Sequence, residues 1–217
     1  MRAPRLAMAT LALAASCAGA MGQSPPSPPP TLQQSPLPGT PAPAPVVPPT
    51  AGRQTLITEP GDPGNVDEVN LPSRPALVMA GSGQWEDAYK ALRDAFGKIE
   101  AELARQGIVP TGRPIASFTQ TTDDAFKFDA MIPVAALPSP PPTLPAGMRF
   151  GETPGGRAYR FVHKGSYEDI DTTYDTVTTY LEAKDIAAKD VFMEEFVNDV
   201  RDGTDVNLEV NIFVQPK

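Results

Sequence analysis

The sequence predicts an α+β domain in which a strand–helix–strand–strand unit occurs twice. The first observation is a repeated turn and helix start, because Gly83-Gln-Trp-Glu-Asp87 is matched by Gly165-Ser-Tyr-Glu-Asp169. The second is a pair of alternating apolar segments, 126–134 and 206–214, which end the two units. One such unit cannot bury its apolar faces alone, whereas two packed side by side can. We therefore expect a curved antiparallel sheet with two helices and a cleft between the halves.

Residues 1–20 are typical of an export signal. A charged start precedes an apolar stretch over residues 6–15, and Ala18-Gly-Ala20 fits a small-residue cleavage site. A second interpretation uses the only cysteine, because Leu13-Ala-Ala-Ser-Cys17 resembles a bacterial lipobox in which Cys17 is lipidated. Both interpretations predict an exported bacterial protein, either periplasmic or anchored to the envelope by a lipid. Both also leave the folded part without cysteine, which excludes disulfides there.

Residues 21–65 are predicted to form a disordered linker. The chain has 27 prolines, and many lie in runs such as Ser24-Pro-Pro-Ser-Pro-Pro-Pro30. Such runs favour an extended polyproline II conformation that has no apolar face to bury. We interpret this segment as a spacer, or as a tether if Cys17 carries a lipid.

The first half-unit of the predicted domain (66–217) covers about residues 71–134. A strand at 76–80 leads through Gly83 into an amphipathic helix, and Gly107 stands where a C-cap would end it. The helix is recognised by apolar residues spaced alternately four and three apart: Trp85, Tyr89, Leu92, Phe96, Ile99 and Leu103. Strands around 115–118 and 126–134 complete this half.

The second half-unit covers about residues 147–214, after a proline cluster at 138–145. Strands are expected at 148–153 and 157–163, followed by a helix from Tyr167 and strands at 191–197 and 206–214. When the halves are aligned, Phe118 matches Phe196. The same alignment pairs Phe126 with Val206 and Phe128 with Leu208.

Charge and histidine content limit the partners and the chemistry. The formal net charge is −8, which argues against nucleic acid and anionic membrane as partners, because both need neutralising Lys and Arg. His163 is the sole histidine, so a His-rich metal site is excluded. Its position at a strand end before Gly165 favours a structural role in the turn. No cofactor or metal is expected, and the membrane is a partner only through the lipid anchor.

Residues from about 71 to 217 resemble the GyrI-like (gyrase-inhibitor-like) effector-binding domain, also found behind the DNA-binding parts of AraC- and MerR-type regulators. The resemblance is carried by His163-x-Gly165-x-Tyr167 and by Ile132-Pro-Val134. It is also carried by Glu195-Phe-Val-Asn-Asp199, which is similar to the family's Glu-x-Tyr-Leu-Asn-Asp stretch, with Phe196 where the family often has tyrosine. The resemblance implies a pocket for small, often lipophilic cationic molecules, with an acidic residue at its centre. The sequence has no helix-turn-helix, so only the binding module carries over.

Glu195 is the position that the resemblance assigns to the central acid. Strand alternation puts Glu194 and Glu195 on opposite faces, and we expect Glu195 to face inward together with Met193 and Val197. A carboxylate buried in an apolar cavity is costly, and a cationic ligand relieves that cost. Four aromatic residues are candidate walls that could stack on the ligand, although Trp85 and Phe118 could equally be core: Tyr167, Tyr159, Trp85 and Phe118.

We therefore expect an exported small-molecule-binding domain of the bacterial cell envelope, acting without catalysis. Three alternatives stay open. Relatives reported as hydrolases of strained cyclopropane compounds suggest a hydrolase with Glu195 as general base. A similarity to the SOUL fold suggests a haem-binding protein in which His163 is the lone axial ligand. The third alternative is an envelope scaffold whose pocket has collapsed.

Overall fold

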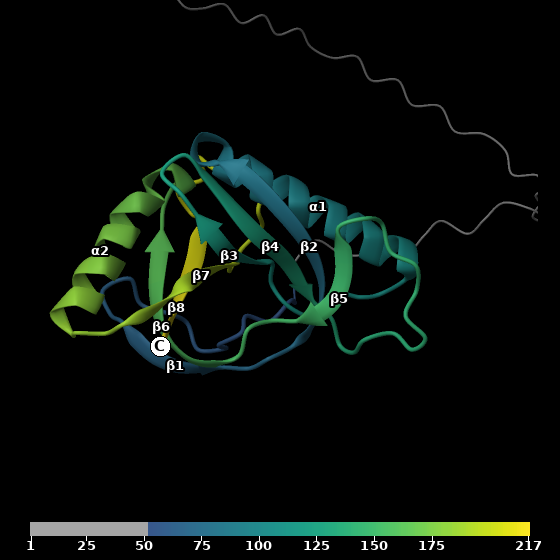
Figure 1. The fold of residues 1–217 in the computed structure, drawn as a ribbon, viewed down its shortest axis with the longest axis horizontal. Coiled ribbons are helices and arrows are strands. Elements are labelled where there is room, and N and C mark those ends of the chain that lie inside the picture. Colours follow the sequence, from purple (N-terminus) through teal and green to yellow (C-terminus); the bar gives the residue numbers. More distant parts are fainter. Residues whose placement is uncertain (1–51) are drawn as a thin grey trace, which may run out of the picture. The chain divides into compact units, whose positions relative to one another are not determined.

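The computed structural model describes residues 52–217, and the predicted signal, Cys17 and residues 21–51 of the predicted linker lie outside this range. Figure 1 shows the fold, in which short 3₁₀ turns η1 (Trp85–Asp87) and η2 (Tyr167–Asp169) lead into helices α1 and α2. The other elements, in chain order, are β1 (Asp67–Leu71), β2 (Pro75–Gln84), α1 (Ala88–Gln106), β3 (Ile115–Thr121), β4 (Ala125–Pro133), β5 (Met148–Glu152), β6 (Gly156–Lys164), α2 (Ile170–Ala183), β7 (Ala188–Phe196) and β8 (Glu209–Pro216).

The eight strands form one antiparallel sheet in the order β1-β6-β8-β7-β3-β4-β2-β5. The two halves meet at its centre, where β3 pairs with β7 and Phe118 lies opposite Phe192. The first strand of each half pairs with the other half, because β1 joins β6 and β5 joins β2. The predicted α+β class, with two helices and duplicated units on a curved antiparallel sheet, is confirmed. The exchange of the outer strands was not predicted.

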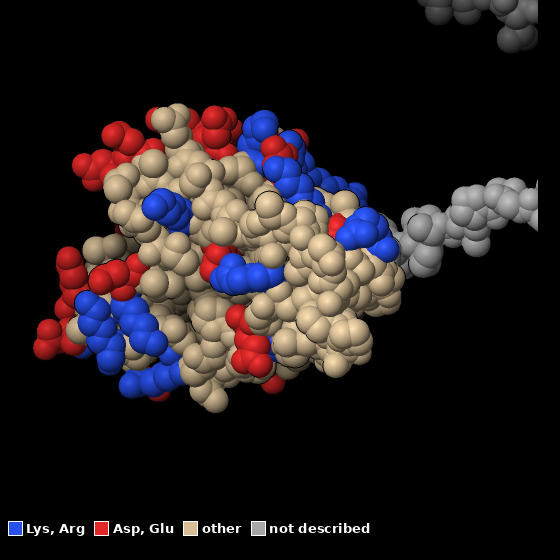
Figure 2. All heavy atoms as spheres, turned by 45° about the vertical axis from the view of Figure 1, so that its right-hand side comes forward, with Lys and Arg blue, Asp and Glu red and all other residues tan. Residues whose placement is uncertain are grey.

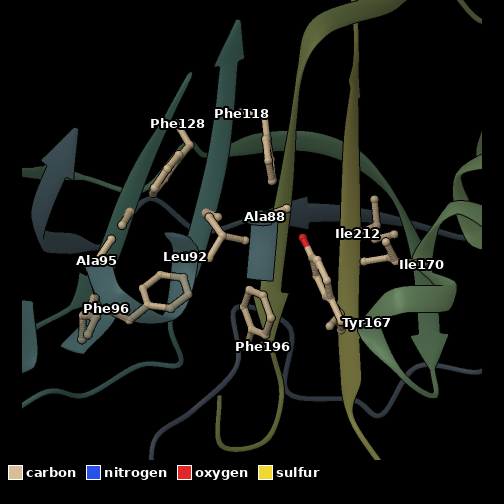
Figure 3. Packing of buried hydrophobic residues seen from close by; sticks show 14 of the residues in the cluster. Ala88, Leu92, Ala95, Phe96, Phe118, Phe128, Tyr167, Ile170, Phe196 and Ile212 are labelled. Carbon is tan, nitrogen blue, oxygen red and sulfur yellow. The ribbon is translucent and has the colours of Figure 1, made fainter. Parts of the chain in front are cut away.

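Both helices cover one face of this sheet and share a single hydrophobic core with it. Leu92, Phe96 and Ile99 of α1 are buried in the same cluster as Phe196 and Ile212 of the sheet. Figure 3 shows Leu92, Phe96, Phe196 and Ile212 among the side chains gathered over the sheet. The helix α1 ends as predicted at Gly107, which has a left-handed φ of 67°. Neither helix within residues 52–217 is long and apolar enough to cross a bilayer.

Part of residues 53–65, which were predicted to be linker, packs against the opposite face of the sheet. Leu56 is buried beside Met193 and Phe213 in a second hydrophobic cluster. Gln54 exchanges backbone hydrogen bonds with Thr111 and Arg113, both 3.1 Å long. The linker prediction is therefore wrong around Leu56, whereas residues 58–60 and 62–65 are exposed. The high proline and glycine content of this segment concealed an apolar anchor that the second face requires.

The internal repeat is aligned two residues differently from the sequence prediction. Gly83 lies opposite Phe126 in the sheet, whereas the Gly165 N–H donates to the carbonyl oxygen of Leu208 at 3.0 Å. Phe126 therefore corresponds to Leu208, and Val206 is 75% exposed before β8 begins. A shift of two residues keeps every side chain on the same face, so alternation could not detect it.

Candidate ligand-binding site

A hollow of about 880 Å³ lies between the two halves, beside the first turns of α1 and α2. Its walls come from Trp85 to Lys90 and Thr121 to Asp123 in the first half. The second half contributes η2, the start of α2, the middle of β7 and the loop at 202–204. The predicted cleft between the halves is therefore present. Its size is within the range of pockets that hold drug-sized molecules.

The turn at Gly165 and Ser166 directs Tyr167 into the hollow. Gly165 has φ of 140°, which a residue with a side chain rarely adopts. The Ser166 hydroxyl accepts a hydrogen bond from the Glu168 N–H at 3.2 Å and so caps η2. The Tyr167 N–H donates to the Gly203 carbonyl oxygen at 2.8 Å, which ties the turn to the loop at 202–204.

Glu194 lies at the base of the hollow and is only 1% exposed. The Tyr167 hydroxyl donates to its Oε2 at 2.8 Å, and the Tyr174 hydroxyl donates to its Oε1 at 2.7 Å. Burial raises the pKa of Glu194 to about 7, although the two tyrosine hydrogen bonds act in the opposite direction. No Lys or Arg within residues 52–217 forms an ion pair with it, so the ionised carboxylate has no counter-charge from that part of the chain.

Aromatic rings from both halves lie around the hollow that Glu194 lines. Phe192 stacks on Phe118, with centroids 4.6 Å apart, and meets Tyr174 edge-on at 5.1 Å. Trp85 is 37% exposed, and its Nε1–H donates to the Thr122 carbonyl oxygen at 2.9 Å. These rings present flat apolar surface next to a single buried acid.

Acidic side chains also line the hollow away from Glu194. There are six of them, and none forms an ion pair within residues 52–217: Glu86, Asp87, Asp123, Glu168, Asp171 and Asp202. Lys90 is the single basic residue among those lining the hollow, and it pairs with Asp94 at 2.7 Å. The space-filling view in Figure 2 shows Asp and Glu along the left side of the face in view, with Lys and Arg among them in its lower part. The potential in the hollow is therefore negative, which attracts cations.

A family model described as a GyrI-like small molecule binding domain matches residues 64–217. The chain belongs to the GyrI-like family. No curated protein sequence matches it. Among solved structures, the C-terminal domain of EcmrR is similar, with 13% identity, a TM-score of 0.56 and coverage of 70% of this chain and 96% of that one.

Two further structures share the fold. EcmrR in its DNA complex has 14% sequence identity to this chain and a TM-score of 0.58. The match covers 70% of this chain and 58% of EcmrR, so the chain spans less than two thirds of that protein. A hydrolase from Listeria innocua has 10% identity and a TM-score of 0.52, with 70% of this chain covering 91% of it. At these identities the likeness concerns the fold alone. Residues 64–217 are thus a GyrI-like small-molecule-binding domain.

The structure brings two of the predicted wall residues to the hollow of this GyrI-like domain and leaves two outside it. Trp85 and Tyr167 line the hollow. Phe118 is fully buried behind Phe192. Tyr159 lies elsewhere, packed against Tyr180 at 6.0 Å, and its hydroxyl accepts a hydrogen bond from Arg157. Whether any of the four contacts a ligand stays a prediction.

Glu195 does not face the hollow, and this part of the sequence interpretation is corrected. It is fully buried on the opposite face, where the Leu56 N–H donates to it at 2.6 Å and Asn211 Nδ2 at 3.0 Å. The predicted alternation is right, but the face that carries Phe192 and Glu194 is the one beneath the helices. Both faces of the sheet are covered, so both acids are buried and alternation could not choose between them.

The family's own motif contained a signal for Glu194. In the stretch Glu-x-Tyr-Leu-Asn-Asp the acid stands two residues before the tyrosine. Since Phe196 occupies the tyrosine position, this spacing assigns the acid to Glu194. Tyr174 was not among the predicted wall residues. It lies seven residues after Tyr167, about two helical turns along, which lets both hydroxyls reach the same carboxylate.

His163 lies near the end of β6, and its ring contacts the turn that follows, which agrees with the structural role that its position predicted. It is buried, with Nδ1 2.8 Å from the Thr173 hydroxyl and Nε2 2.9 Å from the Ser166 carbonyl oxygen. Both ring nitrogens are engaged, so the imidazole in this arrangement has none free for the axial ligation that the haem alternative requires. Within residues 52–217, no cluster of three or more His, Cys, Asp or Glu side chains could hold a metal ion.

Proposed function

We propose that this GyrI-like domain binds lipophilic, positively charged small molecules in the hollow, with Glu194 as their counter-charge. The observation that carries the proposal is a buried carboxylate surrounded by aromatic rings and lacking a basic partner within residues 52–217. A carboxylate in such a place is costly to ionise alone, and this cost is expressed in its raised pKa. A bound cation offsets that cost, so part of the binding free energy comes from relieving it.

The aromatic walls supply the rest of the selectivity. Trp85, Tyr167, Tyr174 and Phe192 can place ring faces against an apolar cation, and each such contact contributes about 0.5 to 2 kcal/mol depending on desolvation. The unpaired acids of the lining raise the local concentration of cations over anions. A neutral or anionic molecule of the same shape gains neither electrostatic contribution.

A binding titration with tetraphenylphosphonium tests this proposal. Tetraphenylborate, which has the same shape and the opposite charge, is the matched control ligand. The phosphonium should bind and raise the melting temperature, while the borate should not. Glu194→Gln should weaken phosphonium binding at least tenfold, whereas Glu195→Gln, which changes the neighbouring acid on the other face, should not. Equal binding of the two ions, or equal effects of the two substitutions, would refute the role of Glu194.

We also propose that the domain acts outside the cytoplasm, in the periplasm or held at the envelope by a lipid. The support is the signal-like pattern of residues 1–20 and the lipobox-like Leu13-Ala-Ala-Ser-Cys17. Mass spectrometry of the mature N-terminus distinguishes the routes, because lipidation leaves an acylated Cys17 and simple cleavage leaves a free Met21. An uncleaved Met1 would contradict export by either route.

Hydrolysis by Glu195 is not part of the proposal. That carboxylate accepts hydrogen bonds from Leu56 and Asn211 on the face away from the hollow. A general base must reach its substrate within hydrogen-bond distance, directly or through one water. Glu195 does not meet this condition for a molecule held in the hollow.

A further inference from the structure

Each carboxylate oxygen of Glu194 already accepts one hydrogen bond from a tyrosine. From this geometry we infer that the hollow selects cations without N–H groups, such as quaternary ammonium and phosphonium ions, over protonated amines of the same shape. The inference rests on the proposed function and specifies its ligand class.

The two tyrosine hydroxyls are held in place by their rings. Tyr167 is buried and stacks on Phe196, with centroids 6.0 Å apart and planes 22° apart. Tyr174 is packed edge-on against Phe192. An ionised carboxylate has about four lone-pair sites, and these two fixed donors occupy two of them. The ionised carboxylate therefore offers a ligand its full negative charge, but it is only partly available as a hydrogen-bond acceptor.

Other acceptors are scarce at the base of the hollow. The strand that carries Glu194 is paired on both sides, with β3 and with β8, so the sheet uses its backbone carbonyl groups. The neighbouring side chains on the sheet are apolar, since Ala116 lies directly opposite on β3 and Phe192 and Phe196 flank Glu194 on the same face. The further acids of the lining belong to the first turns of the helices and the loops, not to the strand beneath them.

A primary ammonium brings three N–H donors that are strongly hydrated in water. Beside Glu194 it meets two partly used carboxylate oxygens and two tyrosine oxygens, so at least part of its hydration is lost without replacement. A quaternary cation has no such donors to satisfy. It receives the same charge attraction and the same aromatic contact, because neither depends on an N–H group.

The test compares two ligands that differ only at nitrogen: biphenyl-4-ylmethyl-trimethylammonium and biphenyl-4-ylmethylammonium. Calorimetric titration of the full chain at pH 7.5, where the amine is protonated, should show the quaternary ion binding roughly tenfold more tightly or better, as expected for one unmet hydrogen bond. This comparison uses the unaltered protein and depends on no variant. Equal binding, or tighter binding of the primary ammonium, overturns the inference.

Tyr174→Phe provides a second readout, because it frees the Oε1 of Glu194. The loss of a donor changes the ionisation of Glu194 for both ligands alike, so the ratio of the two affinities is the quantity to measure. That ratio should fall at least threefold in Tyr174→Phe and stay unchanged in Glu195→Gln. An unchanged ratio in Tyr174→Phe contradicts the inference. If neither cation binds the unaltered protein, the proposed function fails and the inference fails with it, whereas equal binding removes the inference alone.

Discussion

Ala116 and Glu194 lie directly opposite each other across the β3–β7 pair that joins the two halves. The repeat makes them equivalent positions, since Phe118 and Phe196, two residues further on, also correspond. This pair of equivalent positions therefore holds one carboxylate, that of Glu194, whereas a symmetric duplication would place two there. The methyl group of Ala116, which is fully buried, leaves this acid without a like-charged neighbour.

Introducing a second acid at this seam should destabilise the domain in a pH-dependent way. Two carboxylates in adjacent buried positions cannot both ionise at low cost. Ala116→Asp should be less stable than the neutral isostere Ala116→Asn by about 2 kcal/mol or more at pH 8, and the gap should shrink at pH 5 as the acids protonate. Urea unfolding at both pH values measures it. A gap that is the same at pH 5 and pH 8 would argue against like-charge repulsion.

Cation binding should strengthen as pH rises toward neutrality. The pKa of Glu194 is raised to about 7 by burial, so the carboxylate is mostly protonated at pH 5 and mostly ionised at pH 8. Because a cation binds the ionised form, affinity should fall roughly tenfold per pH unit below 7 and level off above it. Tetraphenylphosphonium is a suitable probe, since its own charge does not change with pH. Glu194→Gln is the control and should show weak, pH-independent binding.

The free energy of unfolding should depend on pH through the ionisation of Glu195. Burial raises its pKa from 4.5 to about 7, so the folded state holds a proton that the unfolded state releases over this interval. Its favourable contribution is complete below pH 4.5 and is lost as pH rises through 7. Glu195→Gln, which keeps the shape without the titration, should therefore gain up to about 3 kcal/mol relative to the unaltered protein between pH 4.5 and pH 8. Chemical unfolding of the two proteins across this pH range measures the effect. Their unfolding free energies should diverge as pH rises if Glu195 has the raised pKa, and should change in parallel if it does not.

Residues 53–65 should behave as part of the folded domain. Leu56 is 3% exposed beneath the sheet, so Leu56→Ala removes buried apolar contact and should cost about 2 to 4 kcal/mol of unfolding free energy. Val206→Ala is the matched control, because Val206 is 75% exposed and its truncation should change stability by less than about 0.5 kcal/mol. Similar small effects from both substitutions would restore the interpretation of these residues as linker.

Much of the local structure could be predicted from particular residues. The alternate four- and three-residue spacing from Trp85 to Leu103 predicted α1, and Gly107 its end. The repeated Gly83 and Gly165 turns predicted the duplication and the cleft between the halves. Periodicity also predicted that Glu194 and Glu195 point to opposite faces. These features depend on side chains close in sequence, whose relative directions are set by the helix or strand itself.

The remaining features depend on contacts between distant segments. Alternation along β7 is identical whichever face the helices cover, so the choice of Glu194 as the acid of the hollow required the position of α2, which brings Tyr174 to it. Likewise, Leu56 packs beneath a strand that follows it by more than a hundred residues, and only the folded sheet reveals that partner. The sequence alone determined that two adjacent acids would point in opposite directions. The tertiary structure decided which one lines the hollow, because burial and hydrogen-bond partners arise only when remote segments pack together.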